Sequence, residues 1–224
     1  MRLHLVTLLC CAFGIASSGQ NSPNLKLSQA SAGTLSGDVY TNETVGIVYE
    51  VPSGWSAYTD VKHATMLDPK RSDGAANQCS KILLSLQAPH PVEGRFSSIA
   101  VLIAMDPSCF SNTPFPRSLQ DKKALGKVAD KIIKPFSNST YLSPYGVEIR
   151  AWMLQGHVVI QLVGALTVNA IEGRPAPAKE PLKVNTSFSF TESNGFWVAW
   201  AYLADDPSSE QLNAAKLTFA SASP

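Results

Sequence analysis

The sequence has few cysteines, few charged side chains and no motif known to hold a metal ion or a phosphate. Only 4 of its 224 residues are cysteine, and charged residues make up 16%. It contains no H-E-x-x-H pair, no G-x-S-x-G or S-x-x-K nucleophile motif and no glycine-rich phosphate loop. We therefore predict no catalytic residue, no metal-binding residue and no cofactor.

An excess of positive charge is also missing. Eighteen basic residues stand against 17 acidic ones, a formal net charge of +1. Proteins that bind nucleic acid usually show a basic excess or a basic stripe, so nucleic acid is not an expected partner. No apolar run reaches the roughly 20 residues that a membrane-spanning helix needs, so we expect no transmembrane segment.

The first 18 residues have the three parts of a secretory signal. Arg2 precedes an apolar run from Leu5 to Ile15, and the small residues Ala16, Ser17 and Ser18 follow. This order predicts a signal peptide cleaved after Ser18 and a secreted or periplasmic protein. Lipidation at Cys10 is the alternative, but Cys10 follows two leucines and not the small residue that lipidation favours.

The rest of the chain divides into a short polar stretch and a long globular one. Residues 19–37 are rich in Ser, Asn, Gln and Ala and poor in apolar side chains, which predicts a flexible tether. Residues 38–224 are long enough for a single α+β domain, although two small domains are an alternative.

Two cysteines remain after the signal peptide, and both flank a predicted β-hairpin. Residues 81–88 and 97–105 read as strands, with a turn-rich loop between them. Cys79 precedes the first strand and Cys109 follows the second, so an antiparallel pairing brings the two together. Because export leads to an oxidising compartment, we predict a Cys79–Cys109 disulfide. Two buried free thiols or a metal site are the alternatives, although no histidine lies at zinc-site spacing.

The remaining periodicity predicts one long central helix among many strands. Ser118 is the expected N-cap, Leu125, Val128 and Ile132 share one face, and Pro135 is the expected end. Further strands are expected over 46–51, 56–66, 147–153, 157–168, 186–192 and 196–203, with a turn at 193–195. Asp206 is expected to cap a short C-terminal helix whose end docks through Leu217 and Phe219. The fold class is therefore α+β, with a mainly antiparallel sheet and both helices packed on it.

One group of residues is a candidate binding surface. Glu148, Arg150 and Trp152 alternate along one predicted strand and so share a face. A half-exposed aromatic ring beside charged groups can bind a sugar or another protein. The alternative is that the tryptophans fill the space between helix and sheet. The histidines His63, His90 and His157 have no second ligand at metal spacing and read as ordinary side chains.

The start of the expected domain resembles a known family. The residues that carry the resemblance are Tyr40-Thr41-Asn42, the strand Gly46 to Val51, and Pro52-Ser53-Gly54-Trp55. This segment is similar to the opening of PsbP-like domains, which include an extrinsic photosystem protein and bacterial envelope proteins. The resemblance implies an α/β sandwich and a binding or assembly role, and it transfers no catalytic residue. The Cys79–Cys109 pair is not part of the family's general pattern.

These observations favour an exported, non-enzymatic binding or assembly module. Its expected partner is another envelope or secreted protein, or a small ligand. A secreted or periplasmic hydrolase with an unrecognised catalytic arrangement is the alternative, and a pocket that gathers histidines and carboxylates would favour it.

Overall fold

Two antiparallel sheets and one α-helix make up the part of the chain that the structure describes. This computed structural model describes Leu27 and residues 30–59, 79–89, 98–110, 113–137, 142–168, 182–204 and 216–219. The predicted signal peptide, residues 1–18, lies outside the described residues. Every strand pairing within the described parts is antiparallel. The predicted α+β class is therefore correct in its main feature.

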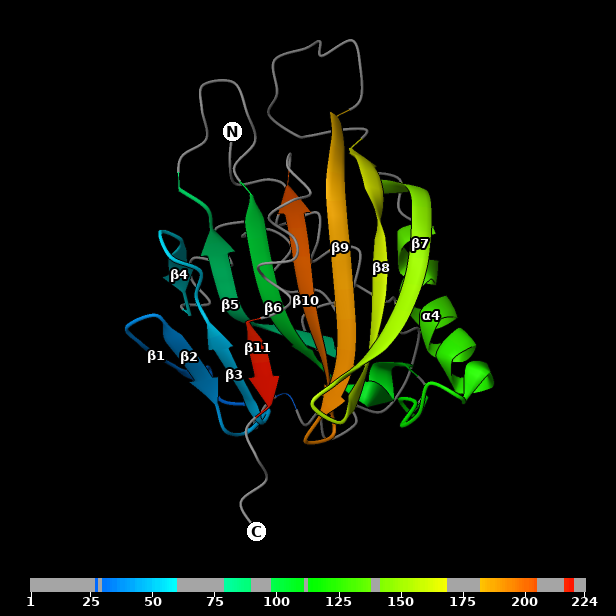
Figure 1. Cartoon of the computed structure of the whole chain (residues 1–224), viewed down its shortest axis with the longest axis horizontal. Helices are drawn as coiled ribbons and strands as arrows, with labels where there is room; N and C mark the ends of the chain where they lie inside the picture. Colours follow the sequence, from blue (N-terminus) through cyan, green and yellow to red (C-terminus); the bar gives the residue numbers. More distant parts are fainter. Residues whose placement is uncertain are drawn as a thin grey trace.

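The larger sheet has seven strands in the order β4-β5-β6-β10-β9-β8-β7 (Figure 1). Their bounds are β4 Ser56–Tyr58, β5 Ser80–Gln87, β6 Ile99–Met105, β7 Leu142–Leu154, β8 His157–Val168, β9 Leu182–Ser193 and β10 Phe196–Ala204. The predicted hairpin of β5 and β6 is confirmed, as is the turn that joins β9 to β10 at Asn194 and Gly195. Strand β7 begins five residues before the predicted strand, which makes it the longest strand of this sheet.

The smaller sheet joins residues from both halves of the chain. Its order is β1-β2-β3-β11, with bounds β1 Thr34–Ser36, β2 Val39–Asn42, β3 Ile47–Glu50 and β11 Leu217–Phe219. The prediction that Leu217 and Phe219 end a helix is wrong, because both lie in a strand that pairs with β3. Two apolar residues two positions apart fit one face of a strand as well as the end of a helix. The predicted helix start at Asp206 lies outside the described residues.

The core lies in two layers, one on each face of the larger sheet. Between the two sheets a cluster of buried side chains includes Tyr40, Ile47, Leu84, Val198 and Trp200. On the other face Trp197 is 1% exposed and stacks on Phe110, with ring centroids 4.4 Å apart. Phe110 ends the short 3-10 helix η2, Pro107–Phe110. Burying apolar surface in both layers gives the sandwich its main stabilisation.

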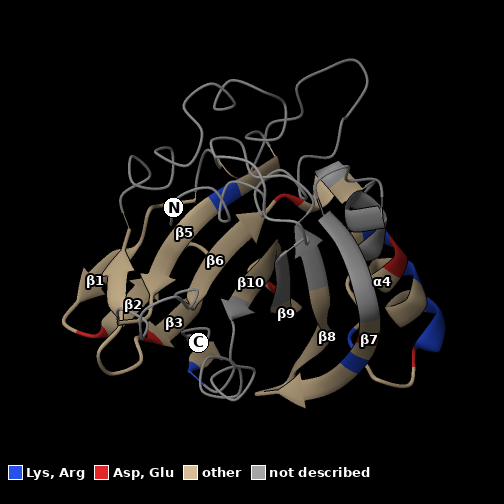
Figure 2. Cartoon of the chain, turned by 90° about the horizontal axis from the view of Figure 1, so that it is seen from above, with Lys and Arg blue, Asp and Glu red and all other residues tan. Residues whose placement is uncertain are grey.

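Helix α4, Lys122–Ser137, lies beside β7 at the end of the larger sheet away from the small sheet (Figure 2). Val128 and Ile132 are buried, as the predicted apolar face requires. The N-cap prediction was wrong by one turn: Asp121 Oδ1 accepts the Ala124 backbone N–H at 2.9 Å, and Ser118 begins the preceding turn. The prediction that Pro135 ends the helix is wrong, because the helix continues to Ser137.

The predicted tether is packed where the structure describes it. Leu27 is 7% exposed and Ala30 is 2% exposed, and both join the core between the sheets. Tyr40 Oη donates to the Ala32 carbonyl at 2.9 Å, and Asn42 Nδ2 donates to the Ser31 carbonyl at 3.0 Å. The prediction of a flexible tether is therefore wrong for Leu27 and residues 30–36. A few buried residues and partly buried hydrogen bonds order a segment whose average composition is polar.

Candidate functional site

Among the described strands, β7 forms one edge of the larger sheet and β4 forms the other. In the described part of the chain, β8 is the one strand that pairs with β7. Residues 147–151 are all exposed, and among them Val147 is 39% and Ile149 is 50% exposed. Because consecutive residues of a strand point to opposite faces, five exposed residues in a row leave side chains on both faces open to solvent among the described residues, while helix α4 also contacts β7. We refer to residues 147–151 as the β7 edge.

An ion pair occupies one face of the β7 edge. Arg150 Nε donates to Glu148 Oε1 at 3.0 Å, and Arg150 Nη2 donates to Glu148 Oε2 at 2.7 Å. This two-point contact holds both side chains in one orientation. The hydrogen bonds from Arg150, and then its positive charge, lower the pKa of Glu148 below its ordinary value. Glu148 therefore stays ionised at neutral pH.

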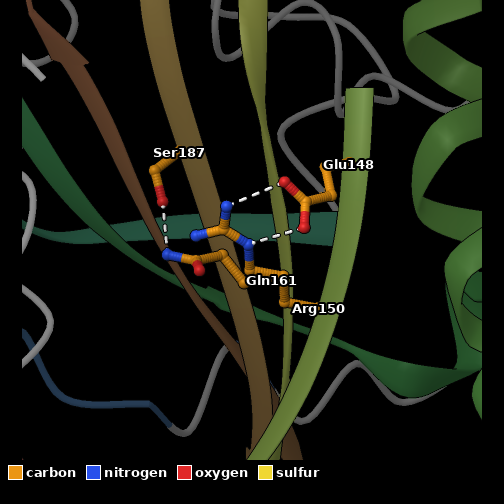
Figure 3. A network of polar contacts seen from close by, with 4 residues as sticks. All are labelled: Glu148, Arg150, Gln161 and Ser187. Carbon is orange, nitrogen blue, oxygen red and sulfur yellow. Dashed lines mark hydrogen bonds and ion pairs between the residues drawn. The ribbon is translucent and has the colours of Figure 1, made fainter. Parts of the chain in front are cut away.

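A polar row continues from this pair into the sheet (Figure 3). Arg150 is the register partner of Gln161 in β8, and Gln161 Nε2 donates to Ser187 Oγ in β9 at 2.8 Å. Gln161 is 7% exposed and Ser187 is 3% exposed, while the Arg150 side chain is 54% exposed. The polar row of Glu148, Arg150, Gln161 and Ser187 thus runs from solvent to the interior across three strands.

Trp152 lies on the same face of β7 but belongs to the packing between the sheets. Its side chain is partly buried and packs against the core cluster between the sheets, which includes Val159 and residues of the small sheet. Trp197 and Trp200 are buried outright. The structure therefore brings Glu148 and Arg150 together as a surface pair and places Trp152 beside the core, next in line on that strand face.

Sequence reasoning missed Gln161 and Ser187. Gln161 is the single polar side chain in the run Val158 to Val163, and that interruption was the available signal. Its partner in β9 is set by the pairing of β8 with β9, which no local pattern reveals.

His157 has a structural place. Its Nδ1 lies 2.8 Å from the Glu192 carbonyl oxygen, and its ring stacks on Phe219 with centroids 3.8 Å apart. His63 and His90 lie outside the described residues. No group of three or more potential metal ligands occurs within the described ranges. None of the helices described there is long and apolar enough to cross a membrane.

The two cysteines of the predicted disulfide lie at the same end of the β5–β6 hairpin. Cys79 is buried and directly precedes β5, and its carbonyl accepts the Asp106 backbone N–H at 3.0 Å. Cys109 lies in η2, three residues beyond Asp106. The β5–β6 hairpin therefore places the backbone of residues 79 and 109 at one end, as the predicted disulfide requires. The bond between the two sulfur atoms stays a prediction.

Comparison with known proteins bears on the fold. No family model matches the sequence, and no curated protein is similar to it in sequence. The fold is similar to the solution structure of cyanobacterial PsbP (CyanoP) from Synechocystis sp. PCC 6803. The two chains are 14% identical with a TM-score of 0.47, and the match covers 84% of this chain and 98% of that one. That structure is of a PsbP protein, the family that the opening segment of this sequence resembles.

Proposed function

We propose that this protein is an exported, non-enzymatic binding or assembly module that contacts its partner through the β7 edge. The observation that carries this proposal is the exposure of five consecutive residues on an edge strand, with apolar side chains on one face and an ion pair on the other.

The β7 edge offers two kinds of contact. The outward N–H and C=O groups of an edge strand can pair with an extended segment of another chain, which is a common mode of peptide recognition. Val147, Ile149 and Met153 are 39%, 50% and 43% exposed, so an added strand can cover apolar surface there. Natural proteins rarely leave a long apolar edge uncovered, because such an edge promotes association.

The proposal includes export and one disulfide. The opening 18 residues carry the features of a signal peptide, and residues 79 and 109 lie at one end of a hairpin. Secreted proteins meet an oxidising compartment in which such a pair is expected to bridge.

Site-specific cross-linking tests the proposed surface. A photoreactive phenylalanine analogue replaces Ile149 in one variant and Val39 in a matched control, since Val39 is 40% exposed on β2 of the small sheet. After exposure to light in the native envelope or secreted fraction, we expect a cross-linked product from position 149 alone. Equal products at both positions, or none at 149 together with turnover of a broad panel of hydrolase substrates, would overturn the proposal.

A further inference from the structure

We propose that one partner of the β7 edge is a second copy of this chain, joined by antiparallel pairing of the two β7 strands about a two-fold axis at Ile149. This inference rests on the proposed function, because it names the occupant of the same surface. Within the described residues β7 is the last strand of its sheet and residues 147–151 are exposed, and the order of their side chains decides the register.

Of the three registers centred on residues 148, 149 and 150, one sets opposite charges of the two copies against each other. Centring the pair on Ile149 sets Glu148 of each copy opposite Arg150 of the other. Centring it on residue 148 sets two glutamates face to face, and centring it on residue 150 does the same with two arginines. Opposite charges at facing positions stabilise a sheet and like charges destabilise it, so the register centred on Ile149 is favoured.

The existing ion pair makes this arrangement a square of four charges. Each Glu148 already accepts two hydrogen bonds from its own Arg150, at 3.0 and 2.7 Å. In the pair, each carboxylate gains a second guanidinium across the junction, and charges alternate around the square. A network of this kind is worth more than an isolated surface pair, which contributes little.

The opposite face of the same register pairs apolar side chains. Ile149 faces Ile149 of the second copy, and Val147 faces Ala151 of the second copy. Ile149 and Val147 are among the few large apolar side chains with substantial exposure in the described chain. Covering them in a continuous sheet removes that surface from water.

The regular part of β7 is long enough for this ladder. Glu148 to Leu154 pair with β8 residue by residue, and the irregularity of the strand lies before Glu148. A strand bulge commonly ends pairing, so the ladder is expected to stop at about residue 147 on each copy. Such a short junction buries little area, and the dimer is expected to be reversible.

Charge reversal tests the register. Sedimentation equilibrium of the full chain should show a concentration-dependent dimer. E148R alone and R150E alone should each raise the dissociation constant by about tenfold or more, because each creates two like-charge contacts by symmetry. The double variant E148R/R150E restores opposite charges at both places and should return to within about threefold of the original chain.

The matched control is the exposed ion pair of Lys216 and Glu50, at 2.7 Å on the small sheet. E50K should leave the dissociation constant unchanged, and circular dichroism should confirm that all variants are folded. A chain that stays monomeric at its highest soluble concentration overturns the proposal. So does a double variant that fails to regain the affinity lost by the single ones.

Cysteine cross-linking supplies a second readout. Ile149→Cys places the two introduced thiols opposite each other on the two-fold axis, within reach of a disulfide. Met153→Cys places them eight residues apart along the strand, about 27 Å, and serves as the control with the same native cysteines. We expect a covalent dimer from the first variant and not from the second. If the chain is monomeric but still cross-links from position 149 to a different protein, the proposal that the partner is a second copy is wrong, and the proposed function stands.

Discussion

Gln161 lies in the buried part of the polar row, where it provides a hydrogen-bond donor for the buried Ser187 hydroxyl. Its amide donates to Ser187 Oγ at 2.8 Å, and both side chains are buried. Gln161→Leu should lower the free energy of unfolding by about 1–3 kcal/mol, because it leaves a buried hydroxyl without its donor. The combined variant Gln161→Leu/Ser187→Ala removes both groups and should cost less than Gln161→Leu alone. Urea denaturation gives both values, and equal or greater loss in the double variant would contradict this explanation.

Arg150 sets the ionisation of Glu148 at the outer end of the row. The pKa of Glu148 is lowered by hydrogen bonds from Arg150 and by its charge. A carboxyl group whose pKa is lowered by folding adds stability above its unfolded pKa, and this stability is lost as pH falls through the folded value. Arg150→Gln should therefore raise the pKa of Glu148 in a carboxyl NMR titration. Lys216→Gln should leave it unchanged, and an unchanged midpoint in the Arg150 variant would refute the cause.

At the scale of elements, the turn before β1 depends on a glycine. Gly33 has a φ of +75°, and a Cβ added there would lie 2.3 Å from Tyr40 Oη. Tyr40 is fully buried and cannot move aside. Gly33→Ala should therefore destabilise the protein by about 1–3 kcal/mol. Gly37 also has a positive φ but open space around it, so Gly37→Ala isolates the backbone strain and should cost less in a thermal melt.

The β5–β6 hairpin carries the disulfide prediction. Replacing Cys79 and Cys109 with serine should lower the free energy of unfolding by about 2–4 kcal/mol, because the bond constrains the unfolded chain. The fold should survive, since a core of this size does not depend on one cross-link. Thiol titration of the unfolded, unreduced protein checks the bond directly: two reactive thiols from these positions would disprove it.

The elements that the sequence predicted well are those that neighbours in sequence define. Strands β5 and β6, helix α4 and the β9–β10 hairpin follow from local periodicity and turn residues. The pair of Glu148 and Arg150 was predictable for the same reason, because residues two apart share a strand face. Ser118 was mistaken for the N-cap because Asp121, three residues later, caps as well as serine does.

Long-range contacts decided what the sequence could not predict. Strand β11 exists because Leu217 pairs with Tyr49, and no local feature distinguishes it from the end of a helix. Ser31 and Ala32 are held by partly buried hydrogen bonds from the side chains of Asn42 and Tyr40, which a polar composition does not reveal. Gln161 meets Ser187 across 26 positions, so its place in the polar row required the sheet register.

For the whole molecule, the pairing of β11 with β3 fixes the order in which the chain can finish folding. Thr218 Oγ1 donates to the Val48 carbonyl, and the two residues are 170 positions apart. During synthesis, residues 47–50 of β3 are made long before residues 217–219 of β11, so the β11 side of β3 has no strand to pair with in the meantime. The nascent protein therefore carries an unpaired strand edge at residues 47–50 until β11 has been made.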